Sequence, residues 1–345
     1  MPKSLVIHPE DEMRLHLRTL GRPEEALFCE YMQTGFAVYA MIHEVVRRLG
    51  RQLEQVDSLL DFASGYGRVV RFLLDDLPAT RVTVSDIYAD AVRFQTEEFG
   101  VHGVVSKAEP DGLDLGGPHD LITCNSLFSH LPEPLFRSWL IKLAAALRDD
   151  GLLLFTTHGP HLFDGHFAGD FAFVPSSESR SLDVQTYGSA YVTMAHVERL
   201  VQELLPGRKL VASLARAANG HQDVYVVGPA SMATITDADL SLPRVFVDGM
   251  VQQGDLVKFW GWAFSQVDGR AVRRLRAFVD HQEVPLATIT GAERPDLLDH
   301  FPNASQQAGF EASFDLAQWM SRRVFALQAE DDHGLRARIF HHLPF

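Results

Sequence analysis

Two carboxylates and two glycines in this 345-residue chain have a spacing that suits a nucleotide-like ligand. Asp61 closes an apolar run that predicts a buried strand, and Gly65 and Gly67 lie in the turn that follows. Glycine lets a ligand approach the backbone closely, and the amides at the start of the next helix favour a carboxylate or a phosphate. Asp86 ends the next predicted strand, about 25 residues after Asp61, where a carboxylate accepts hydrogen bonds from ribose hydroxyls.

The turn itself separates two cofactor classes. A dinucleotide fingerprint needs a third glycine where the helix packs on the strand, and Val70 occupies that position. The pattern Asp-x-x-x-Gly-x-Gly instead resembles motif I of class I methyltransferases, which bind S-adenosylmethionine (SAM). Ala63 replaces the usual first glycine of that motif. An NAD-dependent oxidoreductase remains the alternative.

Two histidines follow predicted strands at the sheet edge where this layout binds its ligand. His130 comes after the strand at 120–125, and His158 comes directly after the strand at 152–157. An alcohol that accepts a methyl group needs a base to take its proton, and a neutral imidazole serves that purpose. We therefore predict His130 and His158 as candidate catalytic bases.

Further histidines and carboxylates lie in a segment that is rich in glycine and phenylalanine. It contains His161, Asp164, His166 and Asp170, but no histidine pair at the i, i+4 spacing of a helical metal site. We expect this segment to be a lid over the cleft, and we predict no metal.

The order of the predicted elements describes the domain that positions these groups. Strands near 59–62, 81–86 and 101–106 alternate with helices, and further strands are expected at 120–125 and 152–157. The last two strands, at 209–215 and 221–227, flank an Asn-Gly turn and predict an antiparallel hairpin. An amphipathic helix over 31–50 precedes the sheet. The pattern predicts a Rossmann-like α/β fold with seven strands.

Several separated motifs narrow the resemblance to a bacterial group of SAM-dependent methyltransferases that often occurs beside glycosyltransferases in polysaccharide gene clusters. The motifs are Phe62–Arg68, Phe128–Glu133, Phe155–Gly159, Tyr187–Ser189 and His221–Val224. The resemblance covers residues from about 25 to 228 and implies SAM binding around the first strand and Asp86, but it does not fix the acceptor. A hydroxyl of a sugar or glycan precursor is the acceptor that we expect. The predicted cofactor-binding residues are Tyr31, Gly35, Asp61, Ala63, Gly65, Tyr66, Gly67, Arg68, Asp86, Ile87, Ser106, Lys107, Asn125 and Ser126.

Composition limits the partners of this chain. A formal net charge of −14 repels phosphate backbones, so a nucleic acid is not expected as a substrate. The two cysteines, Cys29 and Cys124, are too few for a disulfide scaffold and suit a reducing compartment. Neither a signal peptide nor a membrane span is visible. We expect a cytoplasmic enzyme with a small-molecule or glycan acceptor, and a homo-oligomer or a glycosyltransferase partner is possible.

The last third of the chain has a different character. The predicted divisions are a helical segment at 1–50, a methyltransferase domain at 51–229, a linker at 230–242 and an accessory domain at 243–345. About seven short strands in the accessory domain predict a β-sandwich, similar to a module appended to glycosyltransferases. Trp260, Trp262 and Phe264 alternate along one strand, which suits either a core or stacking on a sugar. A non-catalytic SAM-binding scaffold with an interaction module is a further alternative.

Overall fold

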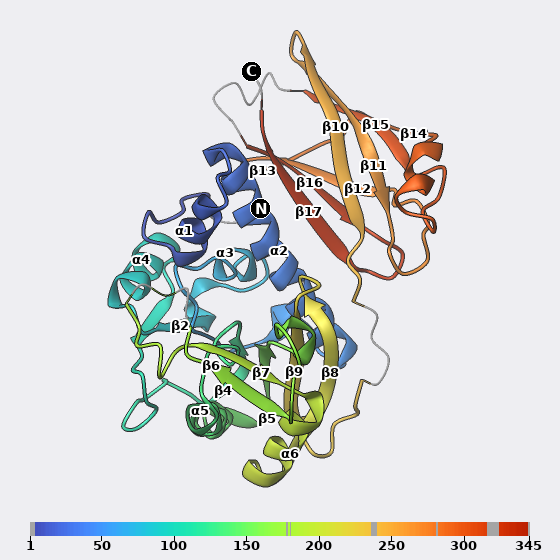
Figure 1. The fold of residues 1–345 in the computed structure, drawn as a ribbon. Coiled ribbons are helices and arrows are strands. Elements are labelled where there is room, and N and C mark those ends of the chain that lie inside the picture. Colours follow the sequence, from blue (N-terminus) through green and yellow to red (C-terminus); the bar gives the residue numbers. More distant parts are fainter. Residues whose placement is uncertain are drawn as a thin grey trace. The chain divides into compact units, whose positions relative to one another are not determined.

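The computed structural model describes residues 4–176, 179, 181–235, 240–280, 282–315 and 324–343. The chain divides into two units, each of which is continuous in space but not in sequence (Figure 1). The α/β unit comprises residues 6–16 and 45–238, and the β unit comprises residues 1–5, 17–44 and 239–345.

The α/β unit is built on a seven-stranded sheet with the order β3-β2-β1-β4-β5-β9-β8. The first five strands in this order are parallel, β9 runs antiparallel to β5, and β8 runs antiparallel to β9. This is the predicted Rossmann-like sheet with its terminal hairpin. The strands are β1 (Leu59–Phe62), β2 (Val82–Asp86), β3 (His102–Val105), β4 (His119–Cys124), β5 (Leu147–Thr157), β8 (Arg208–Ala218) and β9 (Gln222–Pro229).

The helices of this unit begin and end where the sequence supplies the appropriate residues. α4 ends at Gly100, whose φ of +70° is the left-handed conformation of a helix C-cap, and Thr193 caps α6 by accepting from the His196 amide. The apolar faces of α5 and α6 share one core with the central strands. The helices are α3 (Val70–Leu73), α4 (Ala89–Phe99), α5 (Glu133–Ala145) and α6 (Met194–Leu204).

A small second sheet in the α/β unit was not predicted. β6 (Phe171–Val174) pairs in antiparallel fashion with β7 (Ser189–Val192). The sequence predicted only a lid in the segment ahead of β6. The pairing brings together residues 15 to 21 positions apart, and neither strand shows a strong alternation of apolar and polar residues, which is why the pattern did not reveal it.

The β unit contains two four-stranded antiparallel sheets whose inner faces share one apolar core. Phe259 and Phe314 of one sheet contact Phe325 of the other, with ring centroids 5.0 and 5.5 Å apart. One sheet has the order β10 (Arg244–Gln253), β11 (Leu256–Phe264), β15 (Gly309–Asp315) and β14 (Thr288–Ala292). The other has the order β13 (Gln282–Val284), β12 (Arg274–Val279), β16 (Val324–Glu330) and β17 (Arg336–His342).

The fold class is thus confirmed, with one more strand in the β unit than the seven that we counted. The additional strand arises at 282–292, where Pro285 cannot donate to a ladder and separates β13 from β14. Residues 236–239 of the predicted linker lie outside the described residues.

Two helices precede the sheet of the α/β unit in sequence, α1 (Glu12–Thr19) and α2 (Glu24–Arg48). Most of α2 belongs to the β unit. There the Phe28 ring lies 5.3 Å from the ring of His342, and the Arg338 guanidinium lies 4.3 Å above the Phe36 ring. None of the helices in the described part of the chain combines the length and the apolar character that a membrane span requires.

Candidate active site

The turn after β1 has the backbone conformation that its glycines predict. Ala63, Gly65 and Gly67 have φ values of +56°, +55° and +78°. α4 holds this turn from behind, because the Gln95 side-chain amide donates to the Ser64 hydroxyl at 2.8 Å and to the Gly65 carbonyl at 2.7 Å. A rigid turn of this kind presents backbone amides toward a ligand above the sheet.

The two predicted carboxylates lie beside this turn and are buried. Asp86 accepts from the Gly65 amide at 2.8 Å and from the Tyr88 amide at 3.0 Å, and burial raises its pKa to about 6. Asp61 accepts from the Thr123 hydroxyl at 2.7 Å. Burial raises the pKa of Asp61 to about 7, the Thr123 hydrogen bond opposes this rise, and the neighbouring Asp86 adds to it. A ligand that donates hydroxyl hydrogens would stabilise the ionised form of such a pair.

Asn125, directly after β4, gives the clearest indication that a ligand binds at this edge of the sheet. Both its amide nitrogen and its amide oxygen are buried, and neither has a hydrogen-bond partner among the described residues. Buried polar atoms are nearly always paired in folded proteins. An amide that can donate and accept at this edge of the sheet therefore fits a bound cofactor with both kinds of polar group.

The neighbouring Ser126 forms hydrogen bonds within the chain, and its predicted contact with the cofactor stays a prediction. Its hydroxyl donates to the Gln222 side chain at 3.1 Å, and its amide donates to the Thr156 hydroxyl at 2.8 Å. The Thr156 hydroxyl also donates to the Gln222 side chain, at 2.7 Å. This network fixes the backbone where β4 ends, so Ser126 positions Asn125 through the chain.

The N-terminal segment at residues 6–16 covers the turn after β1, which the sequence did not indicate. The His8 ring stacks on the Tyr66 ring with centroids 4.4 Å apart and planes within 9°. The Tyr88 hydroxyl donates to the Glu12 carboxylate at 3.1 Å. Tyr66 was predicted to contact the cofactor, and it is buried beneath this segment.

The two predicted catalytic histidines lie side by side at the ends of β4 and β5. Their ring centroids are 5.7 Å apart. His130 Nδ1 contacts the Gly188 carbonyl at 2.7 Å, and the His130 ring stacks on Tyr187 with centroids 4.7 Å apart. His130 does not cap α5, because that helix begins after Pro132. Its ring is held by the segment before β7 instead.

His158 lies in a more enclosed environment. Its pKa is lowered to about 4, chiefly by burial and to a smaller extent by the nearby rings of His130, His221 and His161. Its Nδ1 atom is buried, with no hydrogen-bond partner among the described residues. The ring is therefore neutral at physiological pH and has a polar atom that a bound molecule can satisfy.

The remaining predicted cofactor residues divide between the two units. Ser106 and Lys107 follow β3, and the Ser106 amide donates to the Asp86 carbonyl at 2.8 Å. Ile87 follows Asp86, and Arg68 lies in the turn before α3. Tyr31 and Gly35 lie on α2 in the β unit, and their role toward the cofactor stays a prediction. His8 and Tyr88, which lie beside the turn after β1 and the end of β2, were not predicted, because no spacing in the sequence marks their aromatic side chains. Tyr187 was part of a motif, but its contact with His130 was not predicted.

Asp170 and His161, which lie in the segment that we considered as a metal site, form hydrogen bonds with other parts of the α/β unit. Asp170 accepts from the Thr193 hydroxyl at 3.0 Å and from the Arg199 guanidinium at 2.6 Å. His161 Nε2 contacts the His221 carbonyl at 2.9 Å. These contacts bind the segment to α6 and to the β8–β9 turn.

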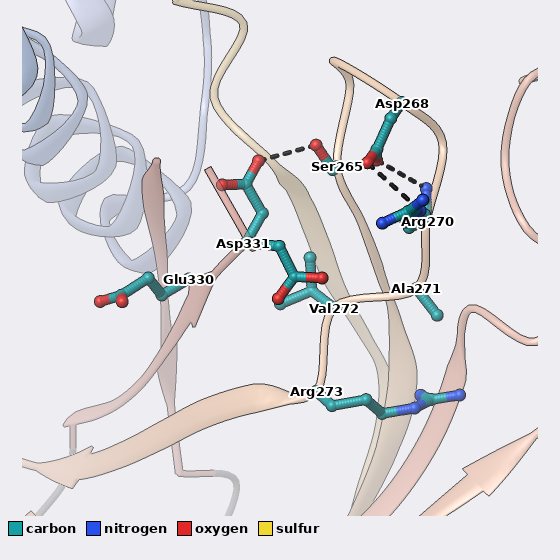
Figure 2. Close-up of a pocket in the computed structure, with 9 residues that line it drawn as sticks. Ser265, Asp268, Arg270, Ala271, Val272, Arg273, Glu330 and Asp331 are labelled. Atoms are coloured by element: carbon teal, nitrogen blue, oxygen red, sulfur yellow. Dashed lines mark hydrogen bonds and ion pairs between the residues drawn. The ribbon is translucent and has the colours of Figure 1, made fainter. Parts of the chain in front are cut away.

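A small polar hollow lies in the β unit and has room for about one water molecule (Figure 2). The Ser265 hydroxyl donates to Asp331 at 2.7 Å, as Figure 2 shows, and the amides of His333 and Leu335 donate to the other oxygen of the same carboxylate. Asp268 is paired with Arg270. Because these carboxylates already have hydrogen-bond and ion-pair partners in the protein, we infer that they stabilise the surrounding loops and do not bind a ligand.

The sheet order, the glycine turn and the carboxylate at the end of β2 together define a Rossmann-like α/β domain with a candidate site for a nucleotide-like cofactor. A family model described as a methyltransferase domain matches residues 30–224, which is more than half of the chain. The protein belongs to this family of methyltransferase domains. The predicted methyltransferase class is confirmed, and the polysaccharide-associated subtype stays a prediction.

Individual relatives are distant. The chain is 28% identical over 145 residues to a malonyl-[acyl-carrier protein] O-methyltransferase of Acetivibrio thermocellus, covering 40% of this chain and 50% of the relative. It is 32% identical over 102 residues to a release factor glutamine methyltransferase of Chlorobaculum tepidum, covering 26% and 34%. The chain thus spans half or less of these curated relatives. Among solved structures, the amino pentose methyltransferase CalS10 of Micromonospora echinaspora has a TM-score of 0.43 at 15% identity, covering 63% of this chain and 95% of that one.

Proposed function

We propose that this protein transfers the methyl group of SAM to a hydroxyl of a sugar or glycan precursor, with His130 as the general base. The observation that carries the proposal is the contact of 2.7 Å between His130 Nδ1 and the Gly188 carbonyl, beside His158 at the ligand edge of the sheet. The malonyl-[acyl-carrier protein] relative is named as an O-methyltransferase, which is consistent with an oxygen acceptor.

The cofactor is SAM, and the α/β unit has groups that fit each of its polar parts. Asp86 accepts from the ribose hydroxyls, the turn at Gly65 and Gly67 admits the amino-acid portion, and the buried amide of Asn125 gains partners on binding. Bound SAM supplies an electrophilic methyl carbon. Val70, which is fully buried where a dinucleotide site has its third glycine, argues against the NAD alternative.

The tautomer of His130 follows from its partner. A carbonyl oxygen only accepts hydrogen bonds, so Nδ1 of His130 carries the hydrogen that it donates to Gly188. The lone pair of the neutral ring therefore lies on Nε2. As the acceptor oxygen bonds to the methyl carbon and the carbon–sulfur bond breaks, Nε2 takes the hydroxyl proton and the sulfur keeps the electron pair.

His158 orients the acceptor in this proposal and does not take the proton. Its pKa of about 4 makes it a weak base, but its buried Nδ1 is available to a second hydroxyl. Burial also raises the pKa of Tyr187 well above its ordinary range, so that its phenol stays protonated and acts as a donor.

The surroundings of the histidines favour a ring-shaped polar acceptor. The ring centroid of Tyr191 lies 5.5 Å from that of His158, and the ring centroid of Phe163 lies 5.1 Å from that of Tyr191. Aromatic faces next to imidazoles suit the C–H face of a sugar and its hydroxyls. An amine acceptor would need correct positioning more than a base. Removal of the histidine base should therefore abolish turnover with a hydroxyl acceptor but not with an amine acceptor.

The test uses His130→Gln and His158→Gln with labelled SAM and a panel of nucleotide sugars and cell-envelope extracts. His102→Gln is the matched control, because His102 is exposed on the edge strand β3. We expect wild-type SAM affinity in all three variants, with turnover reduced about 100-fold or more in His130→Gln. Equal activity of His130→Gln and wild type would exclude the proposed base, and SAM binding without any methyl transfer would favour a non-catalytic scaffold.

The setting of the enzyme is also proposed. The low cysteine count supports a cytoplasmic location, and one of the two cysteines, Cys124, is fully buried as a free thiol. A glycosyltransferase partner and a homo-oligomer are compatible with the exposed surface of the β unit. Gel filtration with light scattering measures the oligomeric state directly.

A further inference from the structure

The outer face of the sheet β10-β11-β15-β14 exposes aromatic side chains. Along β11, Val257, Phe259 and Ala263 point into the core of the β unit, so the alternate residues Trp260 and Trp262 belong to the opposite face. Trp260 is 43% exposed, and Phe246, which pairs with Trp262, is 49% exposed. Several large aromatic residues exposed on one sheet face are unusual, and such a patch indicates an interaction site.

The indole of Trp260 lies flat across the neighbouring strand. A β-bulge at Asp248 places Gly249 opposite Trp260, and a Cβ atom at Gly249 would lie only 2.3 Å from Cζ2 of the indole and 2.8 Å from its Cε2. Glycine is thus the residue that lets the ring rest on the backbone of β10. A ring in this position presents its other face outward.

Hydrogen-bonding groups surround this ring. Glu311 of β15 is the direct cross-strand partner of Trp260 and is exposed. The Arg294 side chain crosses Gly309, since a Cβ atom there would lie 2.8 Å from its Cγ, and its guanidinium donates to Asp248 on β10. Asp296 holds the same guanidinium through two hydrogen bonds of 2.9 and 2.7 Å.

A second aromatic pair extends this surface along the strands. The rings of Phe246 and Trp262 lie 5.8 Å apart with planes within 23°, and Trp262 lies 5.7 Å from Phe264. Of these, Phe264 is buried and supports the others. β10, β11, β15 and β14 lie side by side in one sheet (Figure 1). Phe246 is the cross-strand partner of Trp262, which is two residues from Trp260 on β11, so the exposed rings share one face.

We propose that this face, centred on Trp260, binds a neutral carbohydrate chain. One face of a pyranose ring carries C–H groups that pack on an indole, and its hydroxyls donate to Glu311 and Asp248 and accept from Arg294. The carboxylates that surround the indole disfavour a phosphate or a nucleic acid. A purely apolar partner would leave these charged groups desolvated without hydrogen bonds. The site lies on the β unit alone, so the proposal does not depend on methyl transfer.

The experiment is native affinity electrophoresis of the full-length protein in gels that contain dextran, mannan, xylan or galactomannan. We expect at least one of these polysaccharides to retard the wild type. Trp260→Ala should weaken that binding about tenfold or more, as truncation of a central tryptophan typically does. Glu311→Gln should weaken it by a smaller factor, because the amide keeps one acceptor oxygen.

Ile289→Ala is the matched control. Ile289 is 41% exposed on β14 of the same sheet, but it pairs with the buried Ala312 and so belongs to the other face. Its migration should equal that of the wild type, and Trp260→Phe should retain part of the retardation if Trp260→Ala does not fold. The proposal is overturned if no polysaccharide retards the wild type or if Trp260→Ala is retarded as strongly. It is also overturned if Trp260→Ala converts a dimer into a monomer without affecting retardation.

Discussion

Asp61→Asn should make the protein without cofactor more stable above neutral pH, although Asp61 belongs to the cofactor site. The folded protein raises the pKa of Asp61 from 3.8 to about 7, chiefly through burial. Between these two values the folded chain binds more protons than the unfolded chain, so the free energy of unfolding falls as pH rises through this window. At 1.36 kcal/mol per pH unit, the ionised carboxylate costs the folded state about 4 kcal/mol at pH 8.

Part of this cost is relieved on acidification. For Asp61 alone, lowering the pH from 8 to 5 should restore about 2 to 3 kcal/mol of stability. Asparagine keeps an oxygen that can accept from the Thr123 hydroxyl, and it removes the charge. The variant should therefore lose this part of the pH dependence, while its affinity for SAM should fall.

The assay is urea denaturation of wild type and variant at several pH values between 5 and 8, without SAM. Asp111→Asn is the control, because Asp111 is exposed in a loop. The quantity that decides is the difference in unfolding free energy between wild type and variant as a function of pH. A difference that is constant across this range, or that moves against the variant as pH rises, would refute the assignment of a costly buried charge to Asp61.

Three further predictions test other parts of the molecule. Asp86→Ala should weaken SAM binding by about 1 to 3 kcal/mol in isothermal titration, since the ribose loses a buried acceptor, and unchanged affinity would exclude that contact. Gly67→Ala should lower the free energy of unfolding by more than the roughly 1 to 2 kcal/mol that a positive φ alone costs, because the added Cβ would lie 2.5 Å from the Phe99 ring. The control Gly112→Ala, whose Cβ would meet no neighbour, should show only the cost of the positive φ in urea denaturation. A chain that ends at Ile235 should still bind SAM but unfold at a lower temperature, because α2 loses its contacts with β17; a folded truncated chain that does not bind SAM would show that the β unit completes the cofactor site.

The structure also limits which groups can explain an acidic limb in a pH–rate profile. His158, with a pKa of about 4, stays neutral across the physiological range. Asp86, with a pKa of about 6, becomes protonated as the pH falls below that value, and its protonated form accepts fewer hydrogen bonds. Asp61, with a pKa of about 7, becomes protonated before Asp86. A loss of SAM affinity is therefore expected as the pH falls through about 7 and then about 6, from Asp61 first and Asp86 second.

Local patterns in the sequence were enough to predict the α/β sheet and its cofactor turn. A strand that ends in a carboxylate, two glycines and a helix can be recognised from neighbouring residues, because φ values and strand ends are local properties. The same holds for the β8–β9 hairpin, whose turn contains Asn219 with a φ of +55°. The ion pair between Arg294 and Asp296 is likewise local, because the two residues lie two positions apart in the sequence.

Only the tertiary structure separated the two candidate histidines. His130 and His158 have equivalent places in the sequence, each after a strand of the same sheet. Their difference comes from the Gly188 carbonyl, 58 residues beyond His130, and from the rings that enclose His158. The stacking of His8 on Tyr66 likewise joins segments that no periodicity connects.

Strand β11 of the β unit also shows the difference between what the sequence determines and what the tertiary structure determines. Alternation along β11 determined that Trp260, Trp262 and Phe264 share one face, since successive side chains of a strand point to opposite sides. It did not determine that Phe264 is buried while Trp260 is exposed. Phe264 is buried because Leu297, Ala304 and Ala308, from a segment that follows β14 in the chain, pack against it. Exposure is therefore a property of the assembled unit that the order of residues along one strand does not contain.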